Sequence, residues 1–157
     1  MFLALIAIGC NSGQKLPVGM PSLKPCVLTF TQDGVPLEGA IISLYPASGS
    51  QQWTLGGKTD ATGKAVIFTN GLYEGVPEGS YKVVVSKKES EQSQFGPALN
   101  SDDPGYDEWI QKVSSEQLAS YSLVEKQYTN VNSTTLEIVI PGETSTFDVG
   151  KAVKIKL

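Results

Sequence analysis

Residues 26–45, CVLTFTQDGVPLEGAIISLY, decide the fold class of this chain. Apolar side chains alternate with others over 26–31 and again over 40–45, the period of two that is typical of strands with one face on a core. Asp33-Gly34 supplies a turn after the first of these segments. The stretch therefore predicts two strands whose inner faces are apolar.

The same alternation recurs along most of the chain. It predicts further strands over residues 53–59, 64–68, 81–86, 136–140 and 147–157. The turn sequence Asp60-Ala61-Thr62-Gly63 joins the first two, so we expect them to form a hairpin. Short strands at this spacing predict an all-β fold, an antiparallel Greek-key β-sandwich of about seven strands with a short helical insertion before the last strands.

Three turn segments carry a resemblance to a known family. They are Gly34–Ala40 (GVPLEGA), Thr59–Ala65 (TDATGKA) and Val76–Val83 (VPEGSYKV). They resemble the successive signatures of carboxypeptidase regulatory-like domains, the transthyretin-like and collagen-adhesin B-type sandwiches. The resemblance spans residues 24–87, and the stretch from Lys126 onward is similar to the tail of short bacterial lipoproteins with this domain. Because these segments are mostly turns, the resemblance implies a fold and almost nothing about function.

The first nine residues, MFLALIAIG, are apolar and end at Cys10. They are too short for a span of about 20 residues but suit the apolar region of a signal peptide. Ala7-Ile8-Gly9-Cys10 resembles the lipobox of bacterial lipoproteins, in which the cysteine is acylated. The resemblance implies signal peptide 1–9 and lipidation of Cys10. The alternative is a buried N-terminal strand with an incidental cysteine.

We therefore expect an extracytoplasmic protein, anchored to a membrane on the periplasmic face or at the cell surface. Residues 10–23 contain Gly and Pro among polar residues and predict a flexible tether. Residues 24–157 suit one domain. Within it, residues 89–124 are longer than a structureless loop in a compact domain should be, so we expect an insertion that contains helix.

Two short helices are predicted in this insertion. Asp103-Pro104 matches an N-cap and first-turn pair, and Trp109, Ile110 and Val113 follow on one helical face. Ser114 and Gln117 match a capping box that leads into Leu118 and Tyr121. Two interpretations stay open: the apolar face packs the insertion onto a sheet, or its aromatic side chains form a docking surface.

The amino-acid composition disfavours several classes of function. All 12 basic residues are Lys, there is no His, and the net charge is -4. Without Arg the chain lacks the usual bidentate contacts to phosphates and base edges, so we expect no nucleic-acid partner. Without His it lacks the commonest general base and metal ligand. We expect a protein that is not an enzyme and holds no cofactor or metal.

Other reactive positions have simpler interpretations. Cys26 falls on an inward strand position and is interpreted as a core residue, not as a nucleophile or a disulfide partner of Cys10. Asp60 is the one charged ligand in its segment, which favours a turn over a calcium loop. A weak cation site at the acidic residues 102–108 stays open. Lys24 and Asp148 are the pair to inspect for an isopeptide bond.

The sequence thus predicts a non-catalytic envelope lipoprotein, a structural or interaction module tethered through Cys10. Its expected partners are the membrane and an envelope protein or polysaccharide. The alternative is a carbohydrate-binding module of the cell surface, in which Trp53, Tyr106 and Trp109 stack on sugar rings. A hydrolase with an unrecognised site is the third hypothesis.

Overall fold

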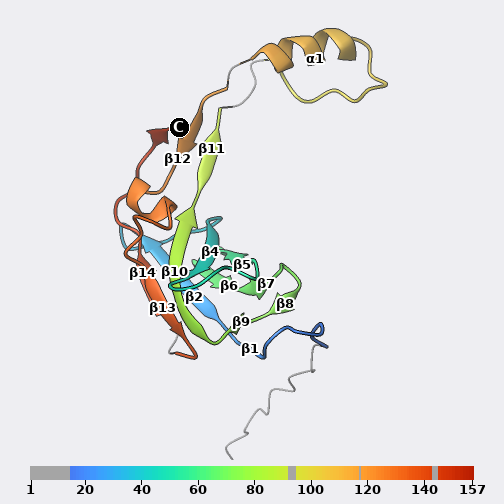
Figure 1. Cartoon of the computed structure of the whole chain (residues 1–157). Coiled ribbons are helices and arrows are strands. Elements are labelled where there is room, and N and C mark those ends of the chain that lie inside the picture. Colours follow the sequence, from blue (N-terminus) through green and yellow to red (C-terminus); the bar gives the residue numbers. More distant parts are fainter. Residues whose placement is uncertain (1–14, 92–94, 117, 143–144) are drawn as a thin grey trace, which may run out of the picture.

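Two β-sheets pack around a single apolar core, and a narrow arm extends from one end of the sandwich (Figure 1). The computed structural model describes residues 15–91, 95–116, 118–142 and 145–157. The predicted all-β sandwich is confirmed. In the described part of the chain, regular helix is confined to α1 (Tyr106–Ser115) and the 3₁₀ helix η1 (Lys126–Thr129).

The larger sheet has six strands in the order β13-β10-β4-β5-β7-β8. They are β13 (Glu137–Ile140), β10 (Gly79–Ser86), β4 (Ile41–Pro46), β5 (Leu55–Lys58), β7 (Phe68–Thr69) and β8 (Tyr73–Glu74). β10 and β4 form the centre, with Val83 opposite Leu44 and Val85 opposite Ile42. All four side chains are buried, as the alternation of both segments predicts.

The second sheet is built around β2, which has partners on both sides. Its strands are β14 (Ser145–Asp148), β2 (Val27–Gln32), β3 (Val35–Pro36) and β6 (Lys64–Val66). β2 and β3 form a hairpin across Asp33 and Gly34, whose φ values of 52° and 74° suit a two-residue turn of type I′. β14 runs parallel to β2, an exception in an otherwise antiparallel fold.

The expected hairpin over residues 53–68 is only partly formed. β5 pairs with β7, but β6 leaves for the second sheet and pairs with β2, so that the turn at residues 60–63 connects the two sheets. The crossing occurs at Ile67, whose N–H donates to the carbonyl of Cys26 while its own carbonyl accepts from Gly75 N. Ile67 is fully buried between the sheets, which explains why the alternation continues through the crossing.

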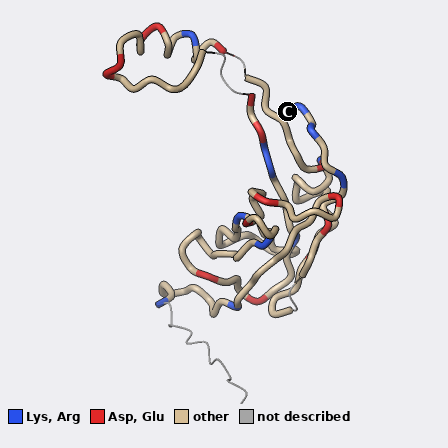
Figure 2. Tube along the Cα trace, turned by 180° about the vertical axis from the view of Figure 1, so that it is seen from behind, with Lys and Arg blue, Asp and Glu red and all other residues tan. Residues whose placement is uncertain are grey.

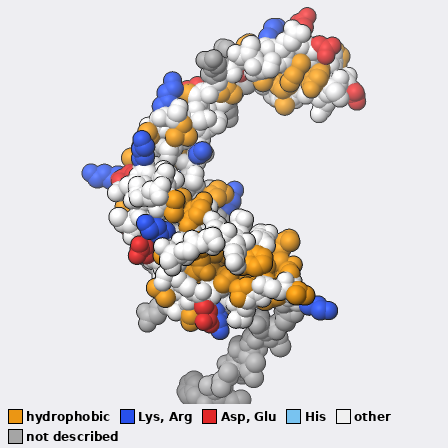
Figure 3. Space-filling view, in the orientation of Figure 1, with side chains coloured by type: hydrophobic (Ala, Val, Ile, Leu, Met, Phe, Trp, Pro, Cys, Tyr) orange, Lys and Arg blue, Asp and Glu red, His pale blue; other side chains and the backbone are white. Residues whose placement is uncertain are grey.

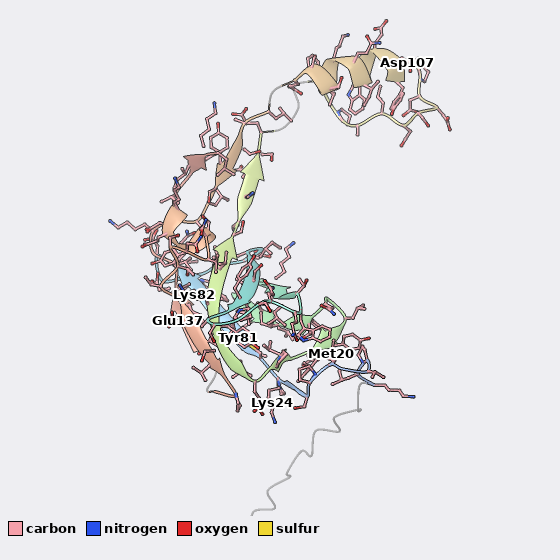
Figure 4. The ribbon with its side chains drawn as sticks, in the orientation of Figure 1. Met20, Lys24, Tyr81, Lys82, Asp107 and Glu137 are labelled. Carbon is pink, nitrogen blue, oxygen red and sulfur yellow. The ribbon has the colours of Figure 1, made fainter. Side chains whose placement is uncertain are left out.

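Tyr81 closes one end of the sandwich. Its hydroxyl donates a hydrogen bond of 2.8 Å to the carbonyl of Pro77, four residues back, and its ring lies in the core. This is the arrangement known in sandwiches as a tyrosine corner. A short pair at the same end joins β1 (Leu23–Lys24) to β9 (Val76–Pro77). The start of the described chain therefore lies at this end of the molecule (Figure 4).

The insertion forms the arm at the opposite end. β10 leads into β11 (Lys88–Ser90), which pairs with β12 (Ser120–Ser122), and the C-terminal strand β15 (Ile155–Lys156) pairs with β12 in turn. We call these three strands the ribbon. The second predicted helix is wrong, because Tyr121 lies in β12, where two neighbouring strands supply hydrogen-bond partners. Gln117 of its predicted capping box lies outside the described residues.

The helix α1 lies beyond the ribbon, at the end of the arm (Figure 1). None of its residues is buried, so the interpretation that its apolar face packs onto a sheet is wrong. The ribbon places the helix too far out for such contacts. Among the described residues, no helix combines the length and the apolar character that crossing a membrane demands.

Candidate functional site

The outer part of the arm, residues 95–116, consists of a loop followed by α1, and we call it the tip. Gly105 precedes the helix with a φ of 85°, a left-handed conformation that suits glycine. The predicted N-cap residue Asp103 does not cap the helix with its side chain. Its carboxylate instead accepts a hydrogen bond of 2.8 Å from Asn100 N, which closes the loop before the helix.

Tyr106 and Trp109 are brought together on α1. Their ring centroids are 6.2 Å apart with an angle of 31° between the planes, and both side chains are half-buried. With Ile110 and Val113 they occupy one face of the helix, because residues three and four apart are neighbours on its surface. Trp109 Nε1 is shielded from solvent and has no hydrogen-bond partner in the described structure. The tip therefore has its own small apolar cluster.

This cluster is incompletely covered. Phe95 and Ile110 are each 37% exposed, and Figure 3 shows apolar side chains of the tip on the concave side of the hook-shaped molecule. The tip also carries five carboxylates and one lysine. Within the described residues no set of three acidic or thiol groups is placed to hold a metal ion. The tip is an acidic surface with an apolar centre.

A polar network connects the strands of the ribbon. Tyr121 Oη donates to Glu91 Oε1 over 2.8 Å, and Ala119 N donates to the other oxygen of Glu91. The hydrogen bond from Tyr121 lowers the pKa of the Glu91 carboxyl and raises the pKa of the tyrosine. Lys154 lies 4.7 Å from the centre of the Tyr121 ring and 3.0 Å from Glu89. These contacts link β15 to the hairpin that carries the tip.

The foot of the arm is attached to the sandwich by side chains of β2 and its turn. Gln32 Nε2 donates to the carbonyls of Leu123 and Lys151, over 2.9 and 3.1 Å. Asp33 Oδ2 accepts from Ala152 N, and Glu125 Oε1 accepts from Lys151 N. The two segments that form the base of the ribbon therefore meet at one edge of the sandwich.

Trp53 lies elsewhere, at the end of the sandwich near Tyr81. Its half-buried side chain packs against the main core and lines a hollow of about 180 Å³. The other walls are Pro21, Pro46, Ser50, Gln52, Leu55, Pro77 and Tyr81. The structure thus brings Tyr106 and Trp109 together and leaves Trp53 apart from them. A single stacking surface made of all three rings is not formed.

Sequence reasoning missed a second, more open hollow. It has a volume of about 560 Å³ and lies over η1 and the turn that follows it. The residues that line it have polar side chains, although most of the lining surface is apolar: Lys126, Gln127, Thr129, Asn130, Asn132 and Ser133. No periodicity or motif marks this segment, because the hollow depends on how a short 3₁₀ helix is placed against β10.

The other reactive residues have structural roles. Cys26 is 4% exposed, and burial raises the pKa of its thiol to about 11, which disfavours the nucleophilic thiolate. Asp60 Oδ1 accepts from the hydroxyl of Thr62 and from the backbone N–H groups of Lys64 and Thr62, as a turn residue does, and these bonds lower its pKa. Lys24 contacts Glu78, and Asp148 accepts from Gly150 N. This arrangement gives no support for an isopeptide bond.

Cys10 lies outside the described residues. No family model, curated protein or solved structure matches the chain. The resemblance to carboxypeptidase regulatory-like domains and to the lipobox therefore stays a prediction from the sequence.

Proposed function

We propose that this protein is a non-catalytic interaction module of the bacterial envelope, tethered to a membrane through lipidated Cys10, with the tip of the arm as its docking element. The observation that carries this function is the composition of α1. Its aromatic and aliphatic face adds nothing to the sandwich core, and no residue of the helix is buried. Aromatic anchors on an exposed element are the groups that dominate binding energy at interfaces.

The placement of the ends supports the tether. The described chain starts at the end of the sandwich that is opposite the arm, as Met20 and Asp107 show in Figure 4. An anchor before residue 15 would leave the tip pointing away from the membrane. A docking element in that position can reach partners beyond the immediate surface.

The tether is tested by metabolic labelling with palmitate and by fractionation. The protein should incorporate the label and sediment with membranes, and Cys10→Ala should abolish both. Cys26→Ala is the matched control, since it removes the other cysteine of the chain and should keep the label. Incorporation that persists in Cys10→Ala would disprove the attachment site.

The docking role is tested by replacing residues 95–116 with a short Gly-Ser turn. If the tip serves only as a docking element, the sandwich keeps its thermal midpoint within about 2 °C, because its core loses no contact. A drop of several degrees would show that the tip is a structural part of the domain. Val83→Ala is the control for a core change and lowers the midpoint clearly.

The hollow beside Trp53 supports a second candidate function, the binding of a single sugar ring. An indole face next to prolines offers the apolar surface on which sugars stack. Titration with soluble cell-wall oligosaccharides should then change the fluorescence of Trp53, in a manner that Trp53→Ala removes and Trp109→Ala retains. If Trp109→Ala abolishes the fluorescence change instead, the sugar binds at the tip and not beside Trp53.

A further inference from the structure

The two parts of the arm carry opposite charges. The tip has five carboxylates, Asp102, Asp103, Asp107, Glu108 and Glu116, against one lysine. The ribbon and the C-terminal segment that joins it have five lysines, Lys87, Lys88, Lys151, Lys154 and Lys156, against Glu89 and Glu91. Figure 2 shows mostly acidic residues over the tip, and both lysines and acidic residues along the ribbon. A net negative and a net positive surface thus lie side by side on one arm.

The charges inside each part are only partly balanced by neighbours. Lys154 pairs with Glu89 at 3.0 Å, and Lys112 lies 4.0 Å from Glu108 at the surface of the helix. Lys88 and Lys156 are exposed, but they lie on opposite faces of the ribbon, because Lys88 faces Ser122 and Lys156 faces Tyr121. Lys88 offers positive charge to an acidic surface that approaches its face.

One face of the ribbon also offers apolar surface. Residues that face each other across antiparallel strands point to the same side, so Lys88, Ser122 and Ile155 share one face of the ribbon. Leu157 N donates to the carbonyl of Ser120, which continues the register and places Leu157 on that face as well. Ile155 is 38% and Leu157 64% exposed. This face therefore combines apolar side chains with a lysine and no carboxylate.

We infer that the tip of one copy docks onto the ribbon of a second copy, and that the second tip docks onto the first ribbon. The apolar face of α1 around Ile110 packs against Ile155 and Leu157, and the carboxylates of the tip meet Lys88, which lies on the same face of the ribbon as these two residues. This inference rests on the proposed role of the tip as a docking element, and it names the partner.

The shape of the molecule suits such a pair. The tip turns sideways from the ribbon, and its apolar side chains face the concave side of the hook (Figure 3). A second ribbon that enters this concave side meets the apolar face directly. Two-fold symmetry makes the two contacts identical and closes the assembly at a dimer. The same exposed surfaces leave a single copy with apolar area uncovered.

Charge-reversal variants can distinguish this dimer from assemblies that use other surfaces. In the tip variant, Asp107→Lys and Glu108→Lys make α1 basic, and in the ribbon variant, Lys88→Glu and Ser90→Glu make the face that carries Ile155 and Leu157 acidic. Each variant alone opposes like charges at both contacts and should dimerise about tenfold or more weakly than the unmodified chain. An equimolar mixture of the two variants opposes unlike charges at both contacts and regains the dimer.

The measurement is sedimentation equilibrium of the full mature chain in density-matched detergent, with different affinity tags on the two variants. A matched control for the ribbon variant, Lys15→Glu with Lys58→Gln, lowers the net charge by the same amount but lies outside the arm and should leave the dimer unchanged. Added salt should weaken the unmodified dimer, since the contacts are partly electrostatic. Ile110→Asp should disrupt it at all salt concentrations.

A monomeric unmodified chain, or variants that do not rescue each other, would overturn the inference. Rescue by mixing also excludes a misfolded tip, because a misfolded surface gains nothing from a complementary partner. Failure here would leave the tether and the docking role standing, since palmitate labelling and replacement of the tip test them independently.

Discussion

Gln32 on β2 donates a hydrogen bond of 2.9 Å from Nε2 to the carbonyl oxygen of Leu123, 91 residues later in the sequence. The same amide also reaches the carbonyl of Lys151. One side chain of the sandwich thus holds both segments that form the foot of the arm. This junction adds to the direct connection through which β10 leads into β11.

Replacing Gln32 by Ala should loosen the foot of the arm. The change leaves two carbonyls without their donor, and for the partly buried one at Leu123 we expect a loss of about 1–2 kcal/mol in unfolding free energy. Hydrogen exchange should accelerate over residues 120–124 and stay unchanged in β4. Gln111→Ala, on the exposed helix, is the control and should have no effect. Equal exchange in both variants would show that the junction does not hold the arm.

Two glycines with nearly the same backbone conformation should respond differently to a methyl group. Gly34 and Gly63 have φ values of 74° and 76°, but a Cβ at Gly63 would lie 2.3 Å from the carbonyl oxygen of Phe30, whereas Gly34 has open space. Gly34→Ala should lower the free energy of unfolding by about 1 kcal/mol, because the new side chain is strained in the left-handed conformation. Gly63→Ala should lower it by about 3 kcal/mol or more, because the backbone must also move to make room for the methyl group.

Urea unfolding of the two glycine variants measures this difference. The comparison is internally controlled, because both replacements add the same atom to a left-handed residue in a turn. Equal losses would mean that the close approach between residue 63 and β2 does not exist in solution.

The thiol of Cys26 should make stability fall in alkaline solution. Its pKa is raised from 9.0 to about 11 by burial, so folding favours the protonated thiol. The protonated thiol therefore contributes fully to the free energy of unfolding below pH 9. This contribution is lost as the pH rises toward 11, and the total loss is about 2–3 kcal/mol for a two-unit shift in pKa. Unfolding free energies at several pH values, in a Cys10→Ser background, give the slope.

Cys26→Ala isolates this effect from the titration of tyrosines and lysines, which both proteins share. The difference between the two stability curves should grow between pH 9 and 11, in step with the raised pKa. Parallel curves would contradict the buried position of the thiol. Slow alkylation of the native thiol at pH 8, and rapid alkylation in urea, provide a second measure.

The carboxyl of Glu91 should titrate differently once its partner is changed. Tyr121→Phe removes the hydroxyl that donates to Glu91, so the pKa of Glu91, which that bond lowers, should move up toward its ordinary value. Tyr73→Phe, on β8, is the control. Carboxyl chemical shifts followed by NMR against pH report the change, and an unaltered Glu91 curve would show that the contact is absent.

The sequence predicted most strands because alternation is a local property. Burial of Leu28, Phe30, Ile42 and Leu44 follows from the period of two, and the turn at Asp33-Gly34 follows from residues that accept a positive φ. The pairing of Tyr106 with Trp109 follows equally from the spacing of three on a helix. These features depend on neighbours a few residues away.

The sequence could not predict the partners of the strands. Lys64–Val66 pairs with β2 instead of continuing a hairpin, and Ser120–Ser122 is a strand because β11 and β15 lie beside it. The separation of Trp53 from the tip has the same origin, since similar aromatic side chains can belong to a core or to an exposed helix.

By itself, then, the sequence determined which residues face inward along each strand, where the chain turns, and that the fold is all β. Tertiary structure decided which strands are neighbours, that the insertion stands out as an arm, and that its acidic tip lies beyond a ribbon rich in lysine. The physical reason is the distance along the chain over which each property is determined. Alternation and turn preference are set by bonded neighbours, whereas strand pairing and exposed surface depend on contacts between segments that meet only when the whole chain has folded.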